Sequence, residues 1–208
     1  MSVVLVISAP SGAGKSTLVE RLVAHDDELE FAVSATSRPP RRQEVPGRAY
    51  RFVSAERFRR MVADGAFLEW AEVFGNLYGT PKDALEGASE RGRDIVLDID
   101  VQGAAQLMKK LPEAVTVFIL PPSRHALEER LRNRSSEKAH EVERRLGAAA
   151  GEVRQYQAYQ YVIVNDDIES SVAALRMILA AERSKRGRMA GPIQPILEEF
   201  GIDPEEPE

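Results

Sequence analysis

The chain has 208 residues, of which 43% are apolar and 29% are charged, and its formal net charge is −5. This length predicts one domain with a core large enough to need no cross-links. The absence of cysteine excludes a disulfide framework, thiol catalysis and a Cys-ligated metal site. The longest apolar run, 3–7, is far shorter than the roughly 20 residues that span a bilayer. No basic region precedes it, so we expect no signal peptide and a soluble, cytoplasmic protein without a membrane partner.

The acidic excess is confined to the C-terminal segment. Residues 187–208 contain six acids and one base, which leaves the rest of the chain neutral. A neutral body argues against a nucleic-acid partner, because such proteins show a basic field. We expect residues 185–208 to be an acidic, Pro- and Gly-containing tail in which 193–200 forms one short apolar turn.

The N-terminal half alternates short apolar runs with helical patterns. Strands are predicted over 3–8, 31–36, 50–53 and 67–74, the first of them buried on both faces. Helices are predicted over 15–24, over 54–64 and over 80–92. Ser54 is the expected cap of the second helix, with Gly65 as its stop, and Thr80 followed by Pro81 is the expected start of the third.

The C-terminal half continues the alternation. Strands are predicted over 94–100, 115–120 and 161–164. Helices are predicted from Ser123 to about Asn133, from about 137 to 156, and after Asp166 or Asp167. Strands separated by helices predict an α/β domain with a mostly parallel sheet.

The strongest local motif is SAPSGAGKST, residues 8–17, between a predicted strand and a predicted helix. A phosphate loop needs glycines that let backbone N–H groups surround an anion, a lysine for the terminal phosphates and a hydroxyl for Mg²⁺. Gly12, Gly14, Lys15 and Ser16 meet these needs. Ala9 stands where the usual pattern has its first glycine, which is tolerated if φ is negative there. The motif predicts a nucleotide site.

An arginine-rich segment follows at 34–50, and Tyr50 at its end offers a phenolic donor. Arginine forks match phosphate oxygens, so the segment is a candidate second phosphate site. A solvated basic loop or a nucleic-acid patch is an equal alternative from this segment alone. The absence of aromatic residues among the first arginines weakens the nucleic-acid alternative.

Carboxylates form a third group. Asp98 ends a buried strand, where a carboxylate suits a phosphate-bound Mg²⁺ reached through water. Glu69 and Asp100 accompany it, and Glu69 by itself would be taken for an exposed strand acid. Tyr78 and Thr80 lie close to Glu69 in sequence.

Together these motifs resemble the guanylate kinase family over residues 2–184. The shared motifs, in order, are SAPSGAGKST, the segment from Ser34 to Tyr50, FLEWAEVFGNLYGTP, LDIDVQG, FILPPS and VIVNDD. The resemblance implies a P-loop kinase three-layer fold with a mostly parallel central sheet, a small GMP-binding subdomain and a helical lid. It assigns 2–33, 91–120 and 158–184 to the core, 34–90 to the GMP-binding part and 121–157 to the lid.

The resemblance also implies ATP-dependent phosphorylation of GMP to GDP with Mg²⁺, a step of purine nucleotide metabolism and GMP recycling. Catalytic roles fall to Lys15, Arg38, Arg134 and Arg145. ATP-binding residues are Ala9, Pro10, Ser11, Gly12, Ala13, Gly14, Lys15, Ser16, Thr17, Arg130 and Asn165, the last facing adenine. GMP-binding residues are Ser34, Arg38, Arg41, Tyr50, Glu69, Tyr78, Thr80, Asp98, Asp100 and Gly103. Ser16 and Asp98, the latter through water, are the metal candidates.

Guanine chemistry agrees with this assignment. N1–H and N2–H₂ of guanine are donors and ionised carboxylates only accept, so Glu69 and Asp100 suit guanine. Adenine would leave its N1 lone pair facing a carboxylate, which is costly in a buried site.

The sequence departs from the family pattern at Gln43 and Ser135, where glycine is usual. These changes could alter GMP affinity and the lid hinge. The alternatives are a non-catalytic guanylate-kinase-like protein-binding module and a ribose 1,5-bisphosphate phosphokinase. We expect a monomer or a homodimer.

Overall fold

A parallel sheet forms the centre of the molecule. The computed structural model describes residues 2–41, 44–133 and 139–202, and its larger sheet has the strand order β2-β7-β1-β8-β9 with every pair parallel. The strands are β1 (Val4–Ser8), β2 (Leu29–Phe31), β7 (Asp94–Asp98), β8 (Val115–Leu120) and β9 (Tyr161–Val164). This sheet confirms the predicted fold class.

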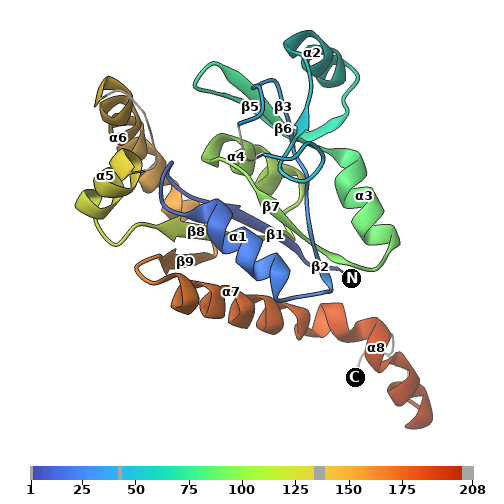
Figure 1. Cartoon of the computed structure of the whole chain (residues 1–208). Coiled ribbons are helices and arrows are strands. Elements are labelled where there is room, and N and C mark those ends of the chain that lie inside the picture. The colour runs from blue at the N-terminus through green and yellow to red at the C-terminus, as the bar shows by residue number, and fades with distance from the viewer. Residues whose placement is uncertain (1, 42–43, 134–138, 203–208) are drawn as a thin grey trace.

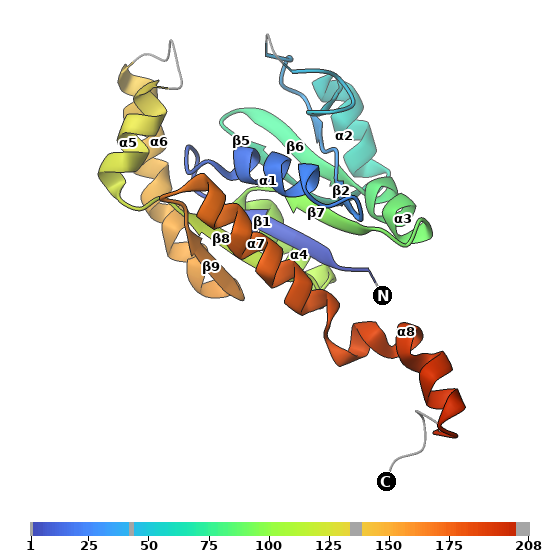
Figure 2. The ribbon, with the colours of Figure 1, turned by 60° about the horizontal axis from the view of Figure 1, so that its bottom comes forward.

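Helices cover both faces of the sheet and make three layers (Figures 1 and 2). On one face α1 (Lys15–Ala24) and α7 (Ile168–Arg183) pack against a cluster that contains Leu5 and Ile7. On the other face α3 (Lys82–Glu90) and α4 (Val101–Lys110) pack against a cluster that contains Val6. Because successive strand side chains point to opposite faces, the continuous apolar run of β1 serves both clusters.

A second, smaller sheet stands above this core. Its order is β4-β3-β6-β5, with strands β3 (Ala35–Thr36), β4 (Arg51–Phe52), β5 (Phe67–Val73) and β6 (Asn76–Pro81). It is covered by α2 (Ala55–Ala63), where Ser54 accepts a hydrogen bond from the backbone N–H of Arg57 as predicted. The rings of Phe58 and Phe67 stack with centroids 4.5 Å apart and join α2 to β5.

Two local predictions are wrong, and one strand was not predicted. The single strand expected over 31–36 is divided between two sheets, because Phe31 pairs with β7 whereas Ala35 pairs with β6. Strand β6 was not predicted, since its sequence NLYGTP contains the strand-poor residues Gly and Pro. Pro81, not Thr80, is the cap residue of α3, and Thr80 belongs to β6.

Helices α5 (Arg124–Asn133) and α6 (Ala139–Val153) form a pair beside the core, and the 3₁₀ helix η1 (Arg154–Ala158) leads back to β9 (Figure 1). Leu127 and Leu131 of α5 pack with Val142 and Ala149 of α6. The hydroxyl of Ser123 accepts from the N–H of Ala126, which confirms the predicted start of α5.

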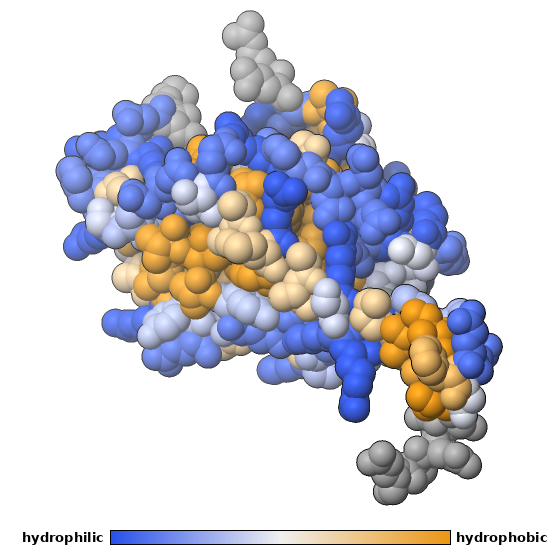
Figure 3. Space-filling view, turned by 90° about the horizontal axis from the view of Figure 1, so that it is seen from below, coloured by the Kyte–Doolittle hydropathy of each residue, from blue (hydrophilic) through white to orange (hydrophobic). Residues whose placement is uncertain are grey.

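The C-terminal segment is more regular than predicted. It forms α8 (Arg186–Glu199), a helix of 14 residues that extends from the end of α7 (Figure 2). Its first turn is tied to the core because Arg188 and Lys185 both pair with the buried carboxylate of Glu182, at 2.8 and 2.7 Å. Apolar side chains gather on its surface (Figure 3). Across the described ranges, no helix combines the length and apolar character needed to cross a membrane.

Candidate active site

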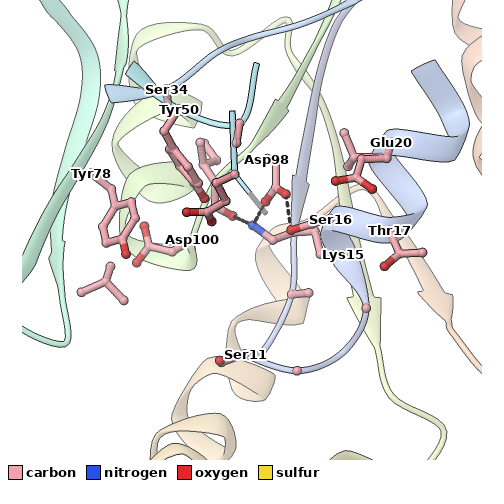
Figure 4. Close-up of a pocket in the computed structure, with 18 of the residues that line it drawn as sticks. Ser11, Lys15, Ser16, Thr17, Glu20, Ser34, Tyr50, Tyr78, Asp98 and Asp100 are labelled. Carbon is pink, nitrogen blue, oxygen red and sulfur yellow. Dashed lines mark hydrogen bonds and ion pairs between the residues drawn. The ribbon is translucent and has the colours of Figure 1, made fainter. Parts of the chain in front are cut away.

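One cleft brings the predicted motifs together. It has a volume of about 1470 Å³ and is lined by the loop after β1, by the small sheet and by α5 and α6. In Figure 4, Lys15, Ser16 and Asp98 lie on the side of the loop, and Tyr50, Tyr78 and Asp100 lie across from them on the side of the small sheet.

The loop between β1 and α1 has the backbone of an anion site. Gly12 and Gly14 have φ angles of 93° and 92°, which L side chains rarely adopt, and Gly14 is the cap residue of α1. Ala9 has no positive φ, so its methyl group fits the position where glycine is usual. The N-terminus of α1 carries N–H groups and a positive helix-dipole end toward the cleft, which suits phosphate.

Lys15 and Ser16 share one carboxylate at the end of β7. The ammonium of Lys15 forms an ion pair with Asp98 and donates to the carbonyl of Ile99 at 2.8 Å. The hydroxyl of Ser16 donates to Oδ2 of Asp98 at 2.8 Å. The structure therefore brings together the cation, the hydroxyl and the carboxylate that a phosphate site with a divalent cation needs.

The side chains of Arg130 and Asn165 hold the phosphate loop through hydrogen bonds to its backbone. The guanidinium of Arg130 donates to the carbonyls of Ala13 and Asn165 at 3.3 and 2.8 Å. The amide of Asn165 is buried, donates to the carbonyl of Ala13 at 2.8 Å and accepts from Ser171. A Cβ at Gly14 would lie 2.6 Å from that amide. In this structure the amide of Asn165 supports the loop, and its contact with adenine stays a prediction.

Glu152 of α6 was missed by the sequence reasoning. Its carboxylate accepts a hydrogen bond of 3.1 Å from the backbone N–H of Ser11, a donor of the phosphate loop. Burial raises the pKa of Glu152 above its ordinary value, which the Ser11 N–H partly offsets. A carboxylate thus sits on a backbone donor of the kind that phosphate would use. Glu152 lies 141 residues from Ser11, so no sequence pattern signals this contact.

A buried carboxylate marks the opposite side of the cleft. Glu69 on β5 is only 3% exposed and accepts from the N–H and the hydroxyl of Thr80 at 2.9 and 2.7 Å. The hydroxyls of Thr80 and Ser34 are 3.3 Å apart. The interpretation of Glu69 as an exposed strand acid is therefore wrong, because the bulge between Phe67 and Glu69 turns its side chain inward.

Asp100 and Gly103 complete this pocket from the other sheet. Asp100 follows β7 and caps α4 by accepting from the N–H of Gly103 at 3.0 Å. A Cβ at Gly103 would lie 2.2 Å from Oε2 of Glu69, so only glycine lets the carboxylate occupy this place. Desolvation by burial, with the neighbouring Asp100 charge, raises the pKa of Glu69 from 4.5 to about 7.

A phenolic and guanidinium cluster lies beside the pocket. Arg38 holds Glu44 with two hydrogen bonds of 2.9 and 2.8 Å and donates to the hydroxyl of Tyr78 at 3.2 Å. The bond to Glu44 raises the pKa of Arg38, and the guanidinium lies 5.5 Å from the centre of the Tyr50 ring. Arg41 is exposed and its backbone N–H donates to Glu44 at 2.7 Å. Glu44 is a further residue that was not predicted as part of the site.

The arginines of α6 reach the small sheet. The guanidinium groups of Arg144 and Arg145 lie 4.7 and 5.7 Å from the ring centre of Phe74, and all three side chains line the cleft. Three residues singled out from the sequence, Arg134, Gln43 and Ser135, lie outside the described residues. Within the described ranges, no group of three or more acidic or histidine side chains could hold a metal alone.

A glycine-rich loop that joins a parallel strand to a helix, with a lysine and a hydroxyl next to a strand-end carboxylate, defines a P-loop nucleotide-binding protein. The family model for guanylate kinase matches residues 1–182. The chain belongs to the guanylate kinase family.

Individual relatives agree with this membership. The chain is 54% identical to the guanylate kinase of Koribacter versatilis over 88% of this chain and 80% of the relative. It is 47% identical to that of Neisseria gonorrhoeae over 94% and 95% of the two chains. The crystal structure of guanylate kinase from Anaplasma phagocytophilum superimposes with a TM-score of 0.78 at 37% identity and covers 97% of each chain.

Proposed function

We propose that this chain transfers the terminal phosphate of ATP to GMP and produces ADP and GDP. The observation that carries the proposal is the buried carboxylate of Glu69, with Asp100 beside it, in the same cleft as the phosphate loop. The proposal includes the divisions expected from the sequence, with a GMP-binding part at 34–90 and a lid at 121–157. We also propose that the protein is a cytoplasmic enzyme of purine nucleotide metabolism and that it is a monomer or a homodimer.

Guanine is the base that this pocket suits. Its N1–H and N2–H₂ groups would donate to Glu69 and Asp100, and the hydroxyls of Ser34 and Thr80 would complete the hydrogen bonding. Two donors from Thr80 already fix one oxygen of Glu69, so the carboxylate is oriented before the base arrives. A base that presents a lone pair instead of a donor would leave a buried carboxylate unsatisfied.

The GMP phosphate would bind the cluster of Arg38, Arg41, Tyr50 and Tyr78. The guanidinium of Arg38 is already oriented by Glu44 and Tyr78, so little side-chain freedom would be lost on binding. Because an ionised phosphate is itself a nucleophile, this acceptor needs no general base.

Transfer between two anions depends on position and positive charge. Lys15 would turn from Asp98 to the phosphates of ATP, and Arg145, with Arg134, would approach the transferring group from the lid. Ser16 and Asp98 offer oxygen ligands that fit Mg²⁺, which commonly takes one or two protein oxygens together with substrate phosphates. The bound ion would neutralise charge on the phosphates of ATP. Lid closure would exclude water and so limit hydrolysis.

The two alternative functions each leave part of the site unexplained. A protein-binding module has no use for Lys15 and Ser16 on a strand-end carboxylate. A kinase of ribose 1,5-bisphosphate has no use for the buried acid at Glu69.

A coupled assay of ADP formation tests the proposal. ATP and Mg²⁺ are supplied with GMP, AMP, CMP, UMP or ribose 1,5-bisphosphate in parallel. We expect strong turnover with GMP only. Binding of GMP without turnover of any acceptor would contradict the proposal and favour the binding module.

A further inference from the structure

The hairpin between β5 and β6 carries an aromatic ring at a backbone position that disfavours it. Val73 pairs with Asn76, so the loop consists of Phe74 and Gly75 alone. Their φ angles are 49° and 81°, and Phe74 is the one residue other than glycine with a positive φ in the described ranges. Two-residue hairpin loops with two positive φ angles favour Asn-Gly, because asparagine tolerates the left-handed region far better than a bulky side chain.

The ring of Phe74 does not gain burial in a core from this position. It is 36% exposed and lies at the tip of the hairpin, which extends toward α6 (Figure 1). Strained conformations that persist without a packing reason are found most often at functional sites. The contacts of the Phe74 ring therefore indicate which function the strained backbone conformation supports.

Those contacts come from α6. Arg144 and Arg145 both lie within cation–π distance of the Phe74 ring, at 4.7 and 5.7 Å. The ring face attracts the guanidinium groups but offers no hydrogen-bond acceptor, so this contact itself uses none of their N–H donors. A carboxylate at the same place would bind the arginines and neutralise them.

We propose that Phe74 is a positioning residue for phosphoryl transfer, which holds Arg144 and Arg145 of α6 over the acceptor side of the cleft. The hairpin belongs to the sheet that carries Glu69 and Tyr78, so the ring links the arginines to the element that holds the acceptor. The proposal rests on the GMP kinase function and on the role of Arg145 proposed above. The ring contacts that support this role are those with the two arginines.

Phe74→Asn tests this role because it removes the ring and gives the turn its preferred residue. We expect kcat to fall about tenfold, while KM for GMP stays within about twofold. A tenfold loss corresponds to about 1.4 kcal/mol, the size of a partly desolvated cation–π contact. The midpoint of thermal unfolding should stay equal or rise, because the positive φ is relieved. A structural role alone would lower stability and activity together.

Phe74→Tyr is the matched control because it keeps the ring face and the strained backbone. It should retain the kcat that Phe74→Asn loses. The proposal is overturned if the folded Asn variant keeps kcat within twofold of the unaltered chain, or if the Tyr variant is as slow as the Asn variant.

A fluorescence measurement separates this inference from the proposed function. The chain has a single tryptophan, Trp70, so Trp70→Phe with Phe74→Trp gives one reporter at the hairpin tip. We expect Arg144→Ala to increase acrylamide quenching of this indole, because the ring loses its cover. Unchanged quenching overturns the contact whether or not the chain phosphorylates GMP. Absence of turnover by the unaltered chain contradicts the function instead.

Discussion

The two sides of the cleft are built in different ways. On the side proposed to bind ATP, ten consecutive residues, 8–17, supply the loop, and the donors that it offers an anion are mainly backbone N–H groups at the start of α1. On the side proposed to bind GMP, the pocket residues come from four separate segments and contact one another through their side chains: Ser34, Glu69, Thr80 and Asp100.

This difference predicts that the two sides of the cleft respond differently to amino-acid substitutions. The loop is fixed by the φ angles of two glycines, by the start of a helix and by hydrogen bonds from Arg130 and Asn165 to the carbonyl of Ala13, so changes at most other side chains leave it intact. A pocket of side chains depends on the volume and protonation of single groups, because each one is buried against another. The GMP side should therefore lose more from small substitutions than the ATP side.

Glu69→Gln should have the largest effect, because it removes one charge and leaves the shape. We expect kcat/KM for GMP to fall about 10²-fold, because guanine loses a charged acceptor. Glu72→Gln, an exposed acid on the same strand, is the matched control and should keep activity. If both variants have the kinetics of the unaltered chain, the proposed role of Glu69 in binding guanine is contradicted.

Glu69→Gln should also be more stable than the unaltered chain at alkaline pH. The pKa of Glu69 is raised from 4.5 to about 7 in the folded chain, so the folded state loses stability as the pH rises from about 4.5 to about 7. At pH 8, Glu69→Gln should therefore unfold at a higher temperature than the unaltered chain. Its free energy of unfolding should be greater by at most about 3 kcal/mol. Loss of stability together with activity would indicate that Glu69 is needed for packing instead.

Gly103→Ala should disturb the base pocket by volume alone. A new Cβ would lie 2.2 Å from Oε2 of Glu69, so the carboxylate must move. We expect KM for GMP to rise about 30-fold, since displacements near 1 Å can cost up to about 10²-fold. Gly147→Ala is the control, because that helical glycine has open space around it. Equal KM values for the two variants would show that Glu69 can shift at no cost.

The same contrast explains why the sequence predicts the phosphate loop better than the pocket around Glu69. The loop is predicted because its glycines, lysine and hydroxyl are adjacent in the chain. Glu69 was predicted only through the family resemblance, since nothing in the strand pattern shows a bulge that turns an acid inward. Thr80 was expected to cap a helix, whereas its hydroxyl serves Glu69 on the neighbouring strand.

The fold shows the same limit. Single elements such as α1, β8 and β9 have the predicted bounds, because their periodicity and stop signals are local. The division of 31–36 between two sheets was missed, since periodicity does not tell which partner a strand pairs with. Glu152 and Phe74 were missed because their partners lie on distant segments.

The pH should change GMP binding through Glu69. Below a pH of about 7 the carboxyl becomes protonated and presents a donor to the donors of guanine. We expect the Kd for GMP, measured by calorimetry without ATP, to rise about tenfold from pH 8 to pH 6. The phosphate of GMP also titrates in this range, so the Glu69→Gln variant is the reference. The same pH dependence in both proteins would assign it to the phosphate.

Glu152→Gln tests the ATP side and should have the smallest effect. The carboxylate of Glu152 accepts from the N–H of Ser11, which a nucleotide phosphate would compete for. Removal of this negative charge should lower the Kd for ATP with Mg²⁺ about threefold, because less repulsion opposes the phosphates. Since burial raises the pKa of Glu152, the gain should be larger at pH 8, where the carboxyl is more ionised, than at pH 6.

Glu143→Gln provides the control for this effect, because it removes the same charge from an exposed position on the same helix. It should leave ATP affinity unchanged. If Glu152→Gln weakens ATP binding instead, the contact with Ser11 supports the loop in the form that binds ATP. The loop would then depend on a third distant side chain besides Arg130 and Asn165, and the contrast between the two sides of the cleft would be one of degree.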